Sequence, residues 1–138
     1  MIGVDTNVLV RYLAQDDPLQ SALATRFIDV ELSSDQPGFI SLVVLVELCW
    51  VLRRLYAASR DELVATVQDL LGAARFQVDQ RDVVVAALQQ LRSVNRSNTD
   101  LADALIMQLA VAAGCSHTVS FDKTAARTTG MRLLRKLP

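Results

Sequence analysis

The sequence predicts an α/β fold with a mainly parallel sheet that helices cover on both faces. Short apolar or β-branched stretches alternate with amphipathic helical patterns along all 138 residues. This alternation is typical of right-handed strand–helix–strand units, whose strands run parallel in one sheet. No repeat, low-complexity tract or linker interrupts it, so we expect residues 1–138 to form a single domain.

Short apolar stretches bounded by turn residues predict the strands. The expected strands are residues 1–4, 39–40, 76–78, 117–121 and 131–134. Residues 33–38 combine Ser, Asp, Pro and Gly, which is turn chemistry, and separate the second strand from the helix before it.

Apolar side chains at helical spacing predict the elements between the strands. The expected helices are residues 6–14, 18–32, a helix that begins after Ser41 and carries Glu47, 60–71, 81–92, 100–113 and a short turn at 123–128. Residues 95–99 form a polar break between two of them.

Capping residues predict where several helices begin and end. Asp17 precedes a proline and is placed as an N-cap. Ser59 and Glu62 have the spacing of a capping box. Gly72 and Gly114 follow the last periodic residues of their helices and are expected to end them.

The composition describes a globular, rather apolar chain. Hydrophobic residues make up 51% and charged residues 21%, the net charge is −1, and the mean hydropathy is +0.28. This hydropathy is high for a solitary domain and favours an apolar surface for self-association or a partner. The near-zero net charge does not indicate nucleic-acid binding by itself.

Charged residues also bear on localisation. Asp5, Arg11 and Asp16 interrupt any N-terminal apolar region, so we expect no secretory signal. The apolar run 39–52 is too short to span a membrane. Two cysteines in apolar surroundings, Cys49 and Cys115, are expected to be reduced core residues. We therefore expect a cytoplasmic protein.

Acidic residues stand in apolar segments far apart in the chain. The candidate metal ligands are Asp5, Glu47, Asp100, Asp103 and Asp122. A buried carboxylate without a partner is costly, so such acids usually have a partner or a metal. In parallel sheets, sites form at the carboxyl ends of strands, where Asp5 and Asp122 are expected. The pattern indicates a divalent-metal site.

Each acid also has a simpler explanation. Asp5 and Asp122 are placed to cap the helices that follow them. Asp100 favours the dipole at a helix start. Glu47 and Asp103 are harder to explain in this way, because they lie deeper among apolar neighbours.

The residue types favour one class of metal and of chemistry. Carboxylates without a His or Cys cluster suit Mg²⁺ or Mn²⁺ and not Zn²⁺. A metal held by carboxylates commonly activates water against a phosphodiester. Four polar side chains are candidates to orient ligands or substrate: Thr6, Asn7, Ser41 and Ser120. Each is equally well placed to cap a helix.

Basic residues gather in two places. Arg53, Arg54 and Arg60 form one group. The second group lies in residues 121–138 and consists of Lys123, Arg127, Arg132, Arg135 and Lys136. Phosphate contact is the functional interpretation and a solvated face is the structural one.

These segments resemble a known family. Residues 2–10, IGVDTNVLV, look like the opening of PIN-domain ribonucleases. The segments around Glu47, Asp103 and Asp122 resemble its three later acidic motifs, and their order and spacing are similar to VapC toxins of bacterial toxin–antitoxin pairs. Over essentially the whole chain, the resemblance implies a three-layer α/β/α sandwich.

The resemblance also implies an activity and partners. It implies a Mg²⁺- or Mn²⁺-dependent endoribonuclease that acts as a homodimer and is inhibited by a VapB-like antitoxin. By position, Asp5, Glu47 and Asp103 match the core acids and Asp122 the fourth. Asp100 matches an acid that only part of the family has. Asn7 and Ser120 match polar positions near the metal, with Ser120 standing where Thr is more usual.

Two rival functions stay open. A phosphatase that uses Asp5 as nucleophile requires a second Asp two residues later, where this chain has Asn7. A non-catalytic PIN-like module would use the apolar surface to bind a protein partner, although the intact acids argue against lost catalysis.

Overall fold

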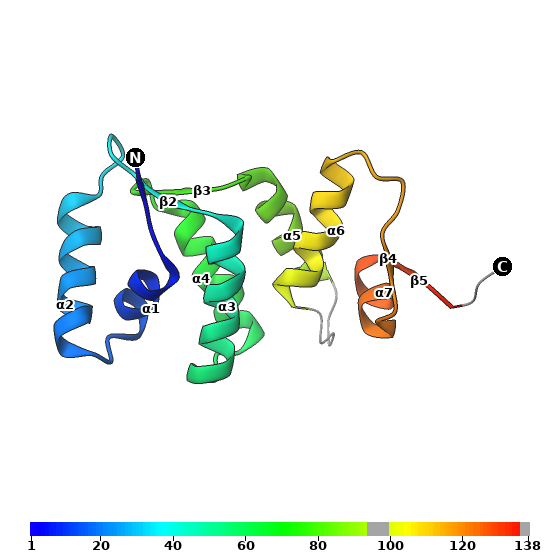
Figure 1. The fold of residues 1–138 in the computed structure, drawn as a ribbon, viewed down its shortest axis with the longest axis horizontal. Helices are drawn as coiled ribbons and strands as arrows, with labels where there is room; N and C mark the ends of the chain where they lie inside the picture. The colour runs from blue at the N-terminus through cyan, green and yellow to red at the C-terminus, as the bar shows by residue number, and fades with distance from the viewer. Residues whose placement is uncertain (94–99, 136–138) are drawn as a thin grey trace. The chain divides into compact units, whose positions relative to one another are not determined.

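The structure is a computed structural model that describes residues 1–93 and 100–135. Its elements follow one another along the chain as strands and helices in alternation (Figure 1). They are β1 (Ile2–Gly3), α1 (Thr6–Ala14), α2 (Pro18–Arg26), the π-helical η1 (Phe27–Glu31), β2 (Gly38–Ile40), α3 (Leu42–Tyr56), α4 (Arg60–Gly72), β3 (Phe76–Val78), α5 (Arg81–Ser93), α6 (Leu101–Ala112), β4 (Val119–Ser120), α7 (Lys123–Thr129) and β5 (Arg132–Leu133).

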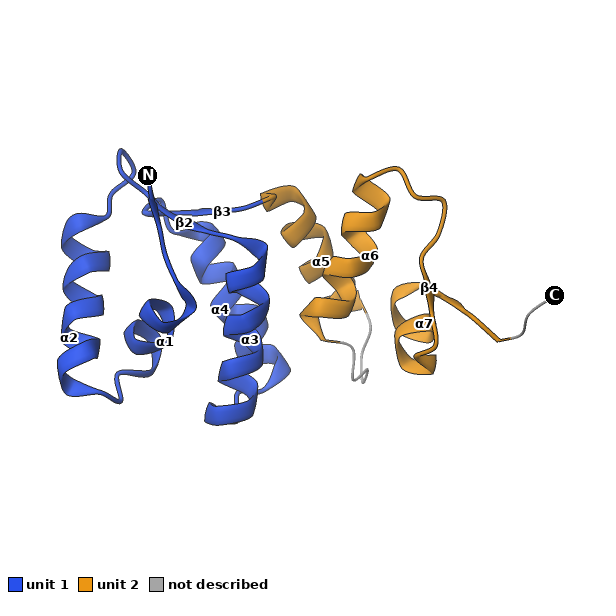
Figure 2. Ribbon diagram, viewed as in Figure 1, with its two compact units in different colours: residues 1–79 blue, residues 80–138 orange. Residues whose placement is uncertain are grey.

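The chain divides into two compact units, Met1–Asp79 and Gln80–Pro138 (Figure 2). Every strand pair within them is parallel among the described residues. The predicted α/β class with parallel sheets is therefore confirmed. The polar break at residues 95–99 lies outside the described residues, and the single domain stays a prediction.

Unit 1 is built on a three-stranded parallel sheet in the order β1-β2-β3. Ile2 pairs with Gly38, and Phe39 in turn pairs with Gln77. The fully buried side chains come from the strands and the helices around them: Leu9, Ile28, Ile40, Leu45, Leu48 and Val67. This core fixes the carboxyl ends of the three strands at one edge of the sheet.

Unit 2 combines the helix pair α5 and α6 with a β4–α7–β5 segment. Val84, Ala87 and Ala104 are fully buried in it. The Gln90 amide joins three helices, because its Nε2 donates to the Thr129 carbonyl at 2.9 Å and its Oε1 accepts from Gln108 at 3.1 Å. β4 and β5 pair in parallel, Val119 opposite Arg132.

Local capping signals are confirmed at most positions. The Asp17 side chain accepts from the Gln20 amide, and Ser59 and Glu62 form the capping box in full. Gly114 ends α6 with φ of 88°, and the Cys115 amide donates to Ala110 in a Schellman arrangement. Each of these interactions depends only on residues close in sequence.

The expected end of α4 is confirmed, because Gly72 is its last residue; an extended Ala73 and not a left-handed glycine follows it. One expectation is wrong. Cys115 is exposed, because the turn that ends α6 carries it away from the core, whereas Cys49 is buried. Within the described part of the chain, no helix is long and apolar enough to cross a membrane.

Candidate active site

The carboxyl edge of the unit 1 sheet brings three polar residues into line. Asp5 follows β1 and Ser41 follows β2, and the Val4 amide donates to the Phe39 carbonyl at 3.0 Å, which keeps the two strand ends in register. Asp79 follows β3, and its amide donates to the Ile40 carbonyl at 2.9 Å. Asp79 is not among the predicted site residues, although it follows a predicted strand directly, which is the same signal that singled out Asp5.

Asp5 occupies the N-cap position of α1 without using its side chain as a cap. Its backbone is extended, with φ −80° and ψ 157°, and its carboxylate makes no capping hydrogen bond. Neither does it pair with a cation among the described residues. The Asp5 carboxylate therefore does not cap α1, and both of its oxygens are free to bind another group. They lie at the start of a helix, where the helix dipole favours negative charge.

Thr6 and Asn7 follow Asp5 in the first turn of α1. Thr6 is 2% exposed, and its Oγ1 has no hydrogen-bond partner among the described residues. Asn7 is exposed. An unpartnered buried hydroxyl costs on the order of 1–3 kcal/mol. A group beside Asp5 that bonds this hydroxyl would recover that cost.

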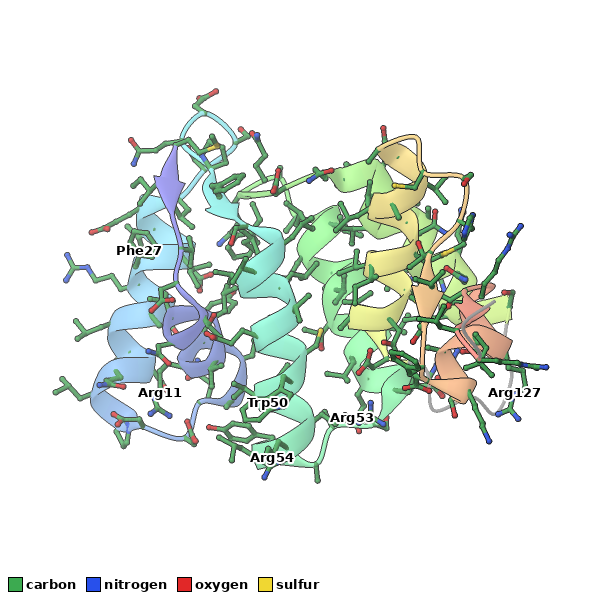
Figure 3. All side chains as sticks on the ribbon, turned by 45° about the vertical axis from the view of Figure 1, so that its right-hand side comes forward. Arg11, Phe27, Trp50, Arg53, Arg54 and Arg127 are labelled. Atoms are coloured by element: carbon green, nitrogen blue, oxygen red, sulfur yellow. The ribbon has the colours of Figure 1, made fainter. Side chains whose placement is uncertain are left out.

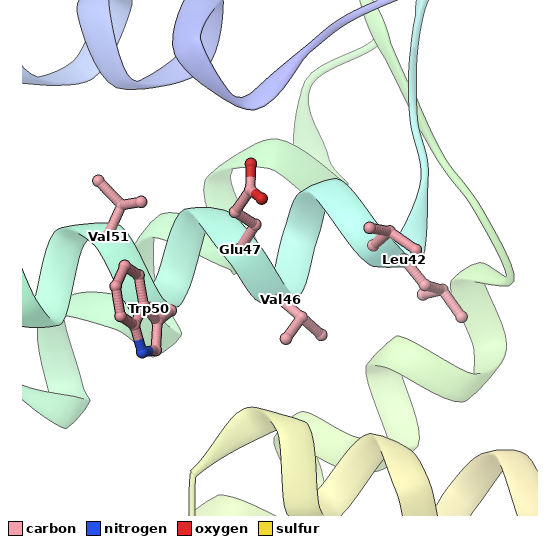
Figure 4. A pocket seen from close by; sticks show the side chains of 6 residues that line it. Leu42, Val46, Glu47, Trp50 and Val51 are labelled. Carbon is pink, nitrogen blue, oxygen red and sulfur yellow. The ribbon is translucent and has the colours of Figure 1, made fainter.

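Glu47 lies on the exposed side of α3. Leu45, Leu48, Cys49 and Leu52 turn the other side of the helix into the core. Glu47 lines a hollow of about 700 Å³ with five apolar residues of the same helix: Leu42, Val43, Val46, Trp50 and Val51. In Figure 4 its carboxylate points to the side of α3 on which the N-terminal segment lies, while Val46 and Leu42 point the other way. It makes no hydrogen bond or ion pair with another described residue.

Three of the five candidate acids lie in unit 2, and two of these three cap helices. Asp100 accepts from the Asp103 amide at 2.9 Å. Asp122 Oδ1 accepts from the amides of Thr124 at 2.8 Å and Ala125 at 3.0 Å. The capping interpretation is thus correct for Asp122, and Asp100, for which only the helix dipole was considered, is a cap as well. Capping uses one oxygen of each carboxylate and leaves the other free, so it does not compete with a second role.

Asp103 is the half-buried acid of this group. Burial raises the pKa of its carboxyl above the ordinary 3.8, and the negative charges of Asp100 and Asp122 raise it further. No basic side chain is among the causes of this shift. The three carboxyls therefore act on one another through space, and a cation among them would remove the repulsion.

The two polar candidates outside α1 both have structural partners. Ser41 caps α3 by accepting from the Val44 amide at 3.2 Å. The Ser120 hydroxyl accepts from the Asp122 amide at 3.0 Å and so fixes the turn into α7. Ser41 thereby sets the start of the helix that carries Glu47, and Ser120 sets the position of Asp122.

Burial was the wrong reason to single out most of the acids. Asp5, Glu47, Asp100 and Asp122 are exposed, and Asp103 alone of the five is half-buried. In the described ranges 1–93 and 100–135, no three His, Cys, Asp or Glu side chains gather closely enough to hold a metal ion. The donor set nevertheless suits a hard divalent cation, because it consists of carboxylates with oxygens that no internal partner uses.

The basic residues fall on separate elements. Arg53 and Arg54 project from the last turn of α3, and Arg127 projects from α7 (Figure 3). The Arg54 guanidinium lies over the Trp50 ring at 5.3 Å from its centroid, a cation–π contact. Lys136 lies outside the described residues.

Comparison with known proteins identifies the family. The PIN domain matches residues 2–131. The chain belongs to the PIN-domain family. PIN-domain proteins are generally nucleases, include toxin ribonucleases, and typically use divalent metals.

A solved structure is also similar to this PIN-domain chain. It is the crystal structure of FitAcB from Neisseria gonorrhoeae, with 16% sequence identity over 98% of this chain and 97% of that chain and a TM-score of 0.35. No curated protein matches the sequence. Because the TM-score is low, the family assignment rests on the domain match alone.

Proposed function

We propose that this PIN domain is a metal-dependent endoribonuclease that hydrolyses an RNA phosphodiester with metal-activated water. The observation that supports this most directly is Asp103, a half-buried carboxylate held beside the charges of Asp100 and Asp122 with no compensating cation. Asp5 and Glu47 supply further carboxylates without internal partners. No basic side chain offsets the negative charges around Asp103, and a divalent cation would do so.

The proposed role of each acid follows from the carboxylate oxygens that it does not use in hydrogen bonds within the protein. Asp5, Glu47, Asp103 and Asp122 are the residues that would hold Mg²⁺ or Mn²⁺, with Asp100 in a supporting place. When bound, such a cation lowers the pKa of a water molecule and offsets charge on the phosphate. Asp122 keeps its orientation through two amide hydrogen bonds to Oδ1 and so presents Oδ2.

The polar and basic side chains would act on the substrate. The exposed Asn7 amide stands next to Asp5 at a helix start, where a phosphate oxygen can accept from it. The unpartnered Thr6 hydroxyl is buried and would orient the Asp5 carboxylate instead. Ser41 and Ser120 would position Glu47 and Asp122 without touching RNA. Arg and Lys side chains near the acids would bind the RNA backbone.

The same proposal includes partners. Apolar side chains are exposed on α2 and α3, including Leu19, Leu23, Val43, Trp50 and Leu55. Such a surface suits a homodimer and an inhibiting VapB-like antitoxin, the partners of a VapC-type toxin. Light scattering of the purified chain would test the dimer, and a monomer at all concentrations would contradict it.

The experiment that tests the nuclease is cleavage of total cellular RNA by the purified chain with Mg²⁺, Mn²⁺ or EDTA. Asp5→Asn and Glu47→Gln should each lose cleavage. Asp35→Asn is the matched control, because Asp35 is an exposed acid in a turn with no described hydrogen bond. Full metal-dependent cleavage by Asp5→Asn would refute the assignment.

One observation favours the rival binding module: no described group of three or more side chains is assembled for a metal. Calorimetric titration with Mn²⁺ separates the two functions. Binding of Mn²⁺ without cleavage of any RNA would support the binding module. Trapping of a phosphoaspartate at Asp5 would instead support the phosphatase.

A further inference from the structure

A groove of about 890 Å³ lies on unit 2 next to Asp122. It is formed by the end of β4, by α7 and by the segment around β5: Phe121, Lys123, Ala126, Arg127, Met131, Leu133, Leu134 and Arg135. The residues before and after Asp122 both line it. Whatever occupies this groove is therefore bound beside one of the proposed metal ligands.

The groove carries three cations that have no partner in the part of the chain that the structure describes. Lys123, Arg127 and Arg135 make no ion pair and no side-chain hydrogen bond with any residue that the structure describes. Three free cations around a partly apolar floor, with Met131 buried in it, form a surface that attracts a polyanion. Arginine prefers phosphate in particular, because its planar fork matches the phosphate oxygens.

The aromatic residue of the groove is exposed. Phe121 leaves 79% of its surface accessible, the highest fraction among the exposed large hydrophobic side chains of the described residues. Its position is fixed from both sides, because β4 pairs with β5 before it and the Asp122 backbone and side chain are hydrogen-bonded after it. An exposed ring beside free cations, on a backbone that is held on both sides, is the arrangement that stacks an unpaired base.

We propose that this groove binds single-stranded RNA, with a base stacked on Phe121 and backbone phosphates on Lys123, Arg127 and Arg135. The inference rests on the proposed nuclease function and names the form of its substrate. A base can reach the face of Phe121 only when it is not stacked in a duplex. The cleaved phosphodiester is therefore in an unpaired segment, a loop or an end, and Phe121 is a positioning residue for it.

Binding without cleavage tests this groove directly. The probe is a fluorescein-labelled mixed-sequence RNA of about 12 nucleotides, a length within ordinary site sizes, titrated by anisotropy in EDTA. Phe121→Ala should weaken binding on the order of tenfold, and Phe121→Tyr should restore it. The same nucleotides in a perfect duplex should bind more weakly than the single strand and be unaffected by Phe121→Ala.

A pair of arginines three residues apart supplies the charge control. Arg135 lines the groove, whereas Arg132 is exposed outside its lining and alternates with Leu133 along β5. Arg135→Gln should reduce the slope of log affinity against log salt by about 0.7, the value for one phosphate of a single strand. Arg132→Gln removes the same charge and should leave the slope unchanged.

Failure of the groove and failure of the nuclease give different results. If Phe121→Ala and Arg135→Gln bind RNA like the unaltered chain while metal-dependent cleavage persists, the groove proposal is overturned and the nuclease stands. If the variants lose binding but the unaltered chain cleaves nothing with Mn²⁺, the groove stands and the nuclease falls. Equal weakening by Arg132→Gln and Arg135→Gln would also overturn the groove, because it would show that RNA is attracted by overall charge and not by the residues that line the groove. Unfolding temperatures of all variants exclude misfolding as the cause.

Discussion

Gly38 connects the packing of unit 1 with the position of Asp5. A Cβ at this residue would lie 2.7 Å from Leu32 Cδ1, 2.8 Å from Val4 Cγ2 and 3.4 Å from Phe76 Cδ1. Leu32 and Val4 are both buried, at 3% and 5% exposure, so neither side chain has free space to move into. The substitution Gly38→Ala must therefore shift the Leu32 and Val4 side chains, and Val4 lies between β1 and Asp5.

The expected loss of stability follows from this overlap. Adding one methyl group to a closely packed core costs about 1–3 kcal/mol, and replacing a strand glycine returns only a few tenths to about 1 kcal/mol through the unfolded chain. For a chain of this length, the net change should lower the midpoint of thermal unfolding by several degrees, roughly 3–8 °C. RNA cleavage should fall as well, since a shift of Asp5 disturbs the proposed ligand set.

Calorimetry and a cleavage assay on the same samples measure both effects. Gly3→Ala is the matched control, because Gly3 lies on the neighbouring strand and a Cβ there meets nothing within 4 Å. Val4→Ala should cost less in the Gly38→Ala background than alone, since it removes one of the two overlaps. Equal midpoints for Gly38→Ala and Gly3→Ala would refute the packing argument.

Three further predictions concern single polar side chains. Asp103→Asn should raise the midpoint of thermal unfolding at pH 7, because a raised pKa means that the ionised Asp103 carboxyl destabilises the fold. This gain should shrink as the pH falls through the pKa of the folded protein and vanish below 3.8. A gain that stays constant across this pH range would contradict the prediction. Thr6→Val should lower RNA cleavage but leave the free energy of unfolding unchanged or raise it by about 1 kcal/mol, because the buried hydroxyl has no described partner to lose. A loss of stability in urea titration would mean that the hydroxyl does have an internal partner. Ser41→Ala should lower the free energy of unfolding by about 1 kcal/mol because the cap of α3 is lost, and Ser41→Asp should restore the cap and this stability. Equal denaturant midpoints for the two variants would contradict this prediction.

Most of the fold was predictable because its signals are local. The caps at Asp17, Ser59 and Ser41 each depend on an oxygen and an amide within three residues, and the sequence shows both partners. Short strands followed by helical periodicity likewise require only neighbours along the chain. The π-helical turn Phe27–Glu31 was not predictable, because its residues continue the same helical pattern as those before them.

The residues of the candidate site were predicted from the sequence, but their exposure to solvent was not. Apolar neighbours suggested a buried Glu47, yet the buried residues Leu45, Leu48 and Leu52 follow helical spacing and leave Glu47 on the opposite face with Val43. The helical period itself contained this information. The effect of Asp100 on Asp103 was predictable, because the two residues stand one turn apart at the start of α6. The effect of Asp122 was not, since it depends on how α6 and α7 pack.

The most direct test of the central proposal is the chemistry of the RNA ends. Cleavage products formed by the purified chain with Mn²⁺ would be analysed by mass spectrometry, beside Asp103→Asn and EDTA controls. Water-driven hydrolysis predicts ends that carry a simple phosphate or hydroxyl, and no products with Asp103→Asn or EDTA. Ends with a 2′,3′-cyclic phosphate would show attack by the RNA 2′-hydroxyl and contradict hydrolysis by water. Cleavage that persists in EDTA would contradict the requirement for a metal.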